Sequence, residues 1–190
     1  LEFPDGRDLN RMFPGTKNGS LASQFAYIFM KDIAPLTDVV IDFHTGSSQR
    51  NNYPQTRCDF NDEASKALCS VFAAPFTIDS SVIAKSIRSA VTKLGKQYIL
   101  YEGGKANRID NFAVEQAIDG TLRVMQHLGI RYFDTEMPDQ KSYTIKKSKW
   151  IRASNSGALN LRIKNGQYVD KGTILATISD PYGKFERKVK

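Results

Sequence analysis

The segment Asp38-Val39-Val40-Ile41-Asp42-Phe43-His44-Thr45-Gly46 decides how the fold is interpreted. Its β-branched and apolar centre, residues 39–43, predicts a short buried strand that ends at His44. Residues 97–101, Gln-Tyr-Ile-Leu-Tyr, predict a second buried strand that leads into Glu102-Gly103-Gly104. Ligands of open α/β sheets bind beyond the carboxyl ends of the strands, so both strand ends are candidate site positions.

Helical patterns surround these two strands. Apolar residues at helical spacing predict helices over residues 21–31, 62–74, 80–94 and 111–128, and Ser20 is the expected cap of the first. Asp79 or Ser80 is the expected cap of the third helix, and Gly129 is expected to close the last. Residues 5–15 and 47–59 are polar and irregular and predict loops. Alternating strands and helices predict an α/β domain over residues 1–135.

The pattern changes after residue 135. Residues 136–142 predict a linker, and the apolar period then falls to two, which is typical of strands. We expect strands over residues 143–146, 150–153, 159–163 and 174–178, separated by turns that contain Gly157, Asn165-Gly166 and Lys171-Gly172. Residues 143–190 therefore predict a small all-β module, which stops before a barrel is complete.

Composition narrows the classes of function. The chain has 190 residues with 41% hydrophobic and 25% charged side chains, and it holds no apolar run long enough to span a membrane. The net charge of +7 is concentrated in residues 141–190, which hold twelve Lys and Arg against three Asp and Glu. No nucleic-acid-binding motif accompanies these charges, so we expect neither a nucleic acid nor a membrane as partner.

The cysteines and the chain ends indicate the cellular compartment and whether the chain is part of a longer protein. Cys58 and Cys69 lack the spacing of a metal or redox motif, and we expect both to be free, buried thiols in a reducing compartment. The opening residues carry no signal-peptide pattern, and they look like the middle of a protein. We therefore expect a cytoplasmic protein of which this chain is a part. A homo-oligomer remains open.

Two side chains at the strand ends suggest chemistry. His44 follows the first strand directly, whereas His127 lies near the end of a helix, where a cation is favourable for structural reasons alone. Glu102 follows the second strand and precedes two glycines that allow a ligand to approach the backbone. An imidazole and a carboxylate on two strand ends suit a metal that acidifies water and a base that takes the proton.

A third candidate lies in the N-terminal loop, Arg7-Asp8-Leu9-Asn10-Arg11-Met12-Phe13-Pro14. The amide of Asn10 and the guanidinium of Arg11 offer the donors that bind a carboxylate ligand. Asp8 is placed to orient either of them. The structural alternative is turn chemistry, in which Asp and Asn serve as local caps.

Together these motifs resemble the succinylglutamate desuccinylase/aspartoacylase family of zinc hydrolases. The resemblance rests on Asp8-x-Asn10-Arg11-x-Phe13-Pro14, Asp42-x-His44-Thr45-Gly46 and Glu102-Gly103-Gly104, and it covers about the first 133 residues. It implies a mixed sheet flanked by helices, as in zinc carboxypeptidases, present here in part. Residues 143–190 resemble the family's C-terminal β-domain, which is similar to the barrel-sandwich folds of lipoyl and biotinyl domains.

The resemblance also implies roles for single residues. His44 would bind Zn²⁺, Glu102 would be the general base, and Asn10 and Arg11 would bind the carboxylate of the substrate. Arg57 is a further candidate for substrate binding, ahead of Arg88. The family's other two zinc ligands form a His-x-x-Glu pair, which this sequence lacks, so we expect them upstream of Leu1.

Three functions follow as hypotheses. The leading one is zinc-dependent hydrolysis of the amide bond of a small N-acylated amino acid or amine. The same chemistry with another pocket would make a zinc carboxypeptidase that trims peptides. If the missing ligand pair is truly absent, the chain is a non-catalytic binding module that keeps the fold.

Overall fold

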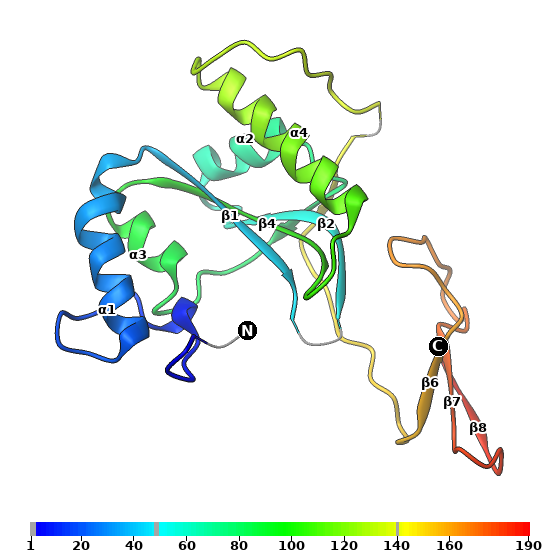
Figure 1. The fold of residues 1–190 in the computed structure, drawn as a ribbon. Helices are drawn as coiled ribbons and strands as arrows, with labels where there is room; N and C mark the ends of the chain where they lie inside the picture. Colours follow the sequence, from blue (N-terminus) through cyan, green and yellow to red (C-terminus); the bar gives the residue numbers. More distant parts are fainter. Residues whose placement is uncertain (1–2, 48–49, 140) are drawn as a thin grey trace. The chain divides into compact units, whose positions relative to one another are not determined.

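The computed structural model describes residues 3–47, 50–139 and 141–190, and these residues form two compact units that divide between Lys147 and Ser148. Residues 48–49 of the predicted loop and Gln140 of the predicted linker lie outside the described residues. The first unit is a mixed sheet with helices on both faces, and the second is a small antiparallel sheet (Figure 1). The predicted fold class is confirmed.

The large sheet has the strand order β1-β4-β2-β3-β5. β1 runs parallel to β4, β4 is antiparallel to β2, and β2, β3 and β5 are parallel to one another. The strands are β1 (Val39–Gly46), β2 (Asn51–Cys58), β3 (Phe76–Asp79), β4 (Gln97–Lys105) and β5 (Tyr143–Ile145).

The helices cover the sheet in two layers. α2 (Glu63–Phe72) and α4 (Asn111–His127) pack on one face, where the core includes Phe72, Ile99 and Val124. α1 (Leu21–Ile28) and α3 (Ile87–Lys93) lie on the other face, as Figure 1 shows, and Val91 and Tyr98 are buried there. Shorter helical turns are η1 (Leu9–Arg11), η2 (Phe29–Ile33) and η3 (Ala34–Leu36).

Alternation along β4 divides its side chains between the two faces. Tyr98 belongs to the cluster beneath α3, whereas Ile99 and Tyr101 belong to the cluster beneath α2 and α4. Because side chains of a strand alternate, Glu102 lies on the face of Tyr98. By the same count, Asp42 and His44 of β1 share that face with Val40, which packs against Tyr98's cluster. One face of the sheet thus collects the polar side chains.

The predicted loop over residues 47–59 is wrong, because residues 51–58 form β2. Pro54 argues against a central strand, since proline cannot donate to the ladder. The structure accommodates it at an irregularity, where the register with β4 shifts between Asn52 and Gln55. Thr56 and Cys58 of this strand are fully buried, so its polar composition conceals a buried face.

The predicted helix over residues 80–94 is also wrong in its first half. Residues 76–79 form β3, and α3 begins only at Ile87, with Ser86 as its N-cap in place of Asp79 or Ser80. The Oγ atom of Ser86 accepts a hydrogen bond from the Ser89 N–H at 3.1 Å. The other three predicted helices are present, and Ser20, Asp62 and Asp110 cap them.

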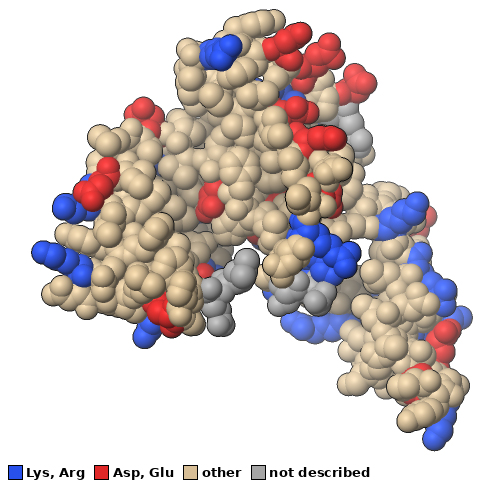
Figure 2. Space-filling view, viewed as in Figure 1, with Lys and Arg blue, Asp and Glu red and all other residues tan. Residues whose placement is uncertain are grey.

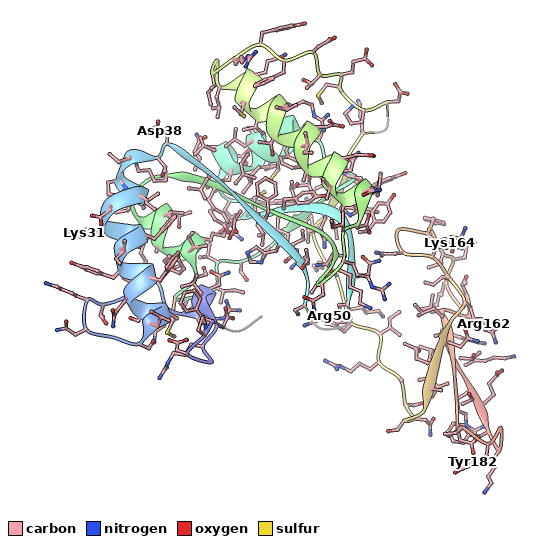
Figure 3. The ribbon with its side chains drawn as sticks, in the orientation of Figure 1. Lys31, Asp38, Arg50, Arg162, Lys164 and Tyr182 are labelled. Atoms are coloured by element: carbon pink, nitrogen blue, oxygen red, sulfur yellow. The ribbon has the colours of Figure 1, made fainter. Side chains whose placement is uncertain are left out.

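The second unit contains β6 (Ala158–Leu161), β7 (Ala176–Ser179) and β8 (Glu186–Val189). Residues 150–153, predicted as a strand, form none, and β8 was not predicted. β5, which the sequence places with this module, pairs instead with β3 in the first unit. On the face shown in Figure 2, most of the charged side chains of this unit are Lys and Arg, in keeping with the charge of residues 141–190. Figure 3 labels Arg162 and Lys164 among them.

Candidate active site

The site is built from the ends of β1 and β4. The ladder between these parallel strands pairs the Cα atoms of His44 and Glu102. Both side chains therefore leave the same sheet face at the same level of the ladder. Just beyond them, the register shifts between His44 and Gly46. Arg50, labelled in Figure 3, directly precedes β2. There the Arg50 Nε donates to the Ser47 carbonyl at 3.3 Å.

His44 is held by a carboxylate two residues before it. The His44 Nε2 lies 3.1 Å from the Asp42 Oδ2, and this hydrogen bond raises the pKa of the imidazole above its ordinary value. Burial raises the pKa of Asp42, but the hydrogen bonds from His44 and Tyr98 outweigh it and leave the pKa below its ordinary value. A neutral imidazole that donates through Nε2 keeps the lone pair of Nδ1 for another partner.

Glu102 is the more enclosed of the two groups, with 12% of its side chain exposed. Its Oε2 accepts a hydrogen bond from the Asn52 amide, and its Oε1 lies 3.7 Å from the Arg57 Nη1. The Arg57 Nε is buried and has no hydrogen-bond partner among the described residues. β2 supplies both neighbours because it runs antiparallel to β4 at the level of Glu102.

The N-terminal loop forms the wall of a pocket beside His44. The pocket has a volume of about 380 Å³, and Asn10, Asp42 and His44 are among its lining residues. The Asn10 Oδ1 accepts a hydrogen bond from the Ile87 N–H at 2.8 Å, which fixes the loop to the start of α3. The amide nitrogen of Asn10, which is a donor, is the group left for a ligand.

Arg11 is placed differently from Asn10. Its Nη1 donates to the Asn10 carbonyl at 2.6 Å and lies 3.9 Å from the Asp8 Oδ2, and the side chain is 45% exposed. It is not among the residues that line the pocket. Asp8 caps the loop through a 2.9 Å hydrogen bond from the Asn10 N–H. Asp8 therefore caps the loop locally, as the structural alternative predicts, and the same loop also forms a wall of the pocket. Arg88 is buried in α3.

Gly103 and Gly104 were expected to let a ligand approach the backbone, and close packing in the structure also requires glycine at both positions. A Cβ atom on Gly103 would lie 2.6 Å from the Tyr101 Oη, and one on Gly104 would lie 3.0 Å from the Asp110 Cβ. These glycines therefore let the start of α4 approach the sheet. They also line a second, smaller pocket of about 230 Å³, on which His44 borders as well.

His44 suits the role of a zinc ligand, but the described residues do not form a complete zinc site. A catalytic zinc takes three protein ligands and keeps one open position. A carboxylate on the second nitrogen of a histidine is the usual neighbour of such a ligand, and Asp42 provides it. Within residues 3–47, 50–139 and 141–190, no three His, Cys, Asp or Glu side chains gather in a way that could hold a metal ion. The described residues therefore supply His44 as a zinc ligand but not the other two.

Two residues of the site carry no motif that the sequence interpretation used. Asn52 was placed in a loop, and only the pairing of β2 with β4 brings its amide to Glu102. Tyr98 was assigned to a strand without a role, although it stands four residues before Glu102 and therefore on the same face. The four-residue spacing along β4 was the signal that could have linked Tyr98 to the site.

Comparison with known proteins agrees with this geometry. A family model described as the succinylglutamate desuccinylase/aspartoacylase catalytic domain matches residues 2–128. The chain belongs to this family. It is 28% identical over 192 residues to the N-alpha-acetyl-L-2,4-diaminobutyric acid deacetylase of Halomonas elongata. That alignment covers 93% of the chain and 54% of the relative, so the chain spans about half the length of this deacetylase.

Solved structures share the fold over nearly the whole chain. The apo structure of the ectoine utilization protein EutE (DoeB) from Ruegeria pomeroyi has a TM-score of 0.85 at 22% identity, covering 100% of this chain and 64% of the other. A succinylglutamate desuccinylase from Silicibacter sp. TM1040 has a TM-score of 0.85 at 24% identity, with 99% and 60% covered. No helix among the described residues is both long and apolar enough to cross a membrane.

Proposed function

We propose that this protein hydrolyses the amide bond of a small N-acylated amino acid or amine, and that the reaction depends on zinc. The proposal rests on one observation: His44 and Glu102 are paired near the ends of β1 and β4, and His44 lines the same pocket as Asn10. The deacetylase from Halomonas elongata supports this reaction class, because its name specifies an N-acetylated diamino acid.

Each residue has a defined part in this scheme. When bound, zinc polarises the scissile carbonyl and acidifies water. His44 offers its Nδ1 as one ligand, because Asp42 occupies the Nε2. Glu102 takes a proton from water and delivers it to the leaving nitrogen, and Asn52 and Arg57 hold its carboxylate in place. Asn10, with Arg11 beside it, binds the carboxylate of the substrate.

Glu102→Gln is the decisive variant, in the full-length protein loaded with zinc. Glutamine has the shape of glutamate and can still accept from Asn52, but it cannot take a proton. General-base loss lowers kcat by at least about a hundredfold while bound zinc stays the same. Glu115→Gln, at an exposed position of α4, is the matched control and retains activity. Full turnover by the Glu102 variant would refute its role.

Two further measurements define the reaction class. Removal of metal with a chelator abolishes turnover, and added zinc restores it if the reaction is zinc-dependent. A substrate panel compares acetyl and succinyl amino acids, acetylated diamino acids and dipeptides. Turnover of dipeptides alone would favour a carboxypeptidase. Absence of both zinc and turnover in the full-length protein would favour a binding module.

A further inference from the structure

A buried tyrosine extends the site inward from His44. The side chain of Tyr98 is 2% exposed, and its hydroxyl donates to the Asp42 Oδ2 at 2.6 Å. The same carboxylate oxygen lies 3.1 Å from the His44 Nε2. Three side chains of two neighbouring parallel strands thus form one chain of hydrogen bonds on the polar face of the sheet.

The hydroxyl of Tyr98 does more than fill space in the core, because it fixes the carboxylate of Asp42. A carboxylate on a partly exposed strand can rotate about its side-chain bonds, and 21% of the Asp42 side chain is exposed. The hydroxyl of Tyr98 fixes one oxygen of that carboxylate, and no other side-chain partner of this hydroxyl is found among the described residues. A carboxylate fixed in this way holds the imidazole by its Nε2–H, which sets both the tautomer and the orientation of the ring.

We propose that Tyr98 is a positioning residue, which acts through Asp42 to hold His44 with the Nε2 protonated and the Nδ1 lone pair directed to the site. The use of that lone pair for zinc rests on the proposed function, whereas the hydrogen-bond chain itself does not. The ring of Tyr98 packs with Ala34 and Val91, so phenylalanine keeps the packing and removes only the hydroxyl.

The chain offers a matched control on the same strand. Tyr101 is likewise buried, and its hydroxyl donates to the Ala113 carbonyl at 2.6 Å. It lies on the opposite face of the sheet, in the cluster beneath α4, and its hydroxyl bonds to that helix. Tyr98→Phe and Tyr101→Phe therefore each remove one buried hydroxyl and one hydrogen bond. Only the first removes a bond to the carboxylate that holds His44.

Nuclear magnetic resonance of the imidazole nitrogens tests the proposal without a substrate or a metal. The chain has two histidines, so His127 serves as the internal reference. In alkaline buffer we expect a protected Nε2–H signal from His44 in the unchanged chain. Tyr98→Phe should make this proton exchange with water at least about tenfold faster, as expected for the loss of one hydrogen bond near 1.4 kcal/mol. Tyr101→Phe should not change its exchange.

Two outcomes would overturn the proposal: unchanged exchange in Tyr98→Phe, or equal acceleration in Tyr101→Phe. A measurement on the unchanged chain covers the case in which Tyr98→Phe fails to fold. The hydroxyl proton of Tyr98 and the Nε2–H of His44 both point at the Asp42 Oδ2, so a nuclear Overhauser effect between them is expected. Its absence would refute the arrangement.

The full-length protein separates this inference from the proposed function. There, Tyr98→Phe should weaken zinc binding about threefold to tenfold, less than the 10–100-fold typical of groups bonded directly to a ligand. If the exchange of the His44 proton changes as expected but the protein binds no zinc, the proposed function fails and the positioning role stands. If zinc binds equally well with and without the hydroxyl, the role of Tyr98 toward the metal fails.

Discussion

Replacement of Arg123 by methionine should destabilise the first unit through the loss of a buried cap. The Nε and Nη2 of this guanidinium donate to the Phe72 carbonyl at 3.2 and 2.8 Å, where α2 ends. Its Nη1 donates to the Glu136 carbonyl at 3.1 Å and so fixes the segment that follows α4. Arg123 is 8% exposed, and burial lowers the pKa of its guanidinium. Methionine keeps most of the aliphatic packing of arginine.

The structure sets the size of the effect. Methionine leaves the Phe72 carbonyl buried without its donor, which costs about 1–3 kcal/mol. The exposed Glu136 carbonyl can turn to water, and removal of a buried charge returns part of its desolvation free energy. A net loss of about 1–2 kcal/mol in the free energy of unfolding follows. Arg123→Lys should lose about half as much, because one ammonium cannot form the three bonds of the guanidinium fork.

Urea unfolding followed by circular dichroism measures this loss. With a slope of about 2 kcal/mol per molar urea, the midpoint should fall by about 0.5–1 M. Arg108→Met, at an exposed position before α4, is the control, and its effect should stay within about 0.5 kcal/mol. Hydrogen exchange should also rise over residues 130–139. A loss below about 0.5 kcal/mol for Arg123→Met would show that the cap contributes little.

Three further results are expected. Gly120→Ala should cost about 1–2 kcal/mol in urea unfolding, because its Cβ would lie 2.3 Å from the Phe72 Cε1, and Phe72→Leu in the same chain should recover part of the loss. Burial raises the pKa values of Tyr98 and Tyr101 above 10, so in ultraviolet titration both should ionise only on unfolding, and the free energy of unfolding should fall as pH rises above about 10. Both cysteines are free and buried, so a thiol reagent should label them in urea and leave the native chain unlabelled.

The sequence was most informative where local patterns suffice. Residues 39–43 form the core of β1 because their β-branched side chains suit a buried strand, and α4 ends within one residue of its predicted end. The N-cap Ser20 could be identified because an N-cap depends only on the next three residues. Both cysteines were correctly expected to be free and buried.

It was least informative where long-range pairing decides the structure. The polar stretch 51–58 becomes a central strand because β4 and β3 supply its hydrogen bonds on both sides. Residues 76–79 form a strand for the same reason, between β2 and β5. No local pattern indicates a partner that lies far away in the chain. β2 and β3, the strands with the weakest sequence signal, therefore depend most on the hydrogen bonds that their neighbouring strands supply.

The site depends on both kinds of information. His44 and Glu102 lie near the ends of strands with clear local signals, so this placement could be predicted, although β1 and β4 continue past them to Gly46 and Lys105. Their alignment depends on the register of β1 with β4, and the groups that hold them come from positions fixed by that ladder or by β2. Asn52 reaches Glu102 from a strand that sequence patterns miss, whereas Tyr98 reaches Asp42 across a ladder between two predicted strands. For that reason a tyrosine four residues before a predicted catalytic carboxylate, opposite an Asp-x-His strand, is a pattern that can be sought in sequence.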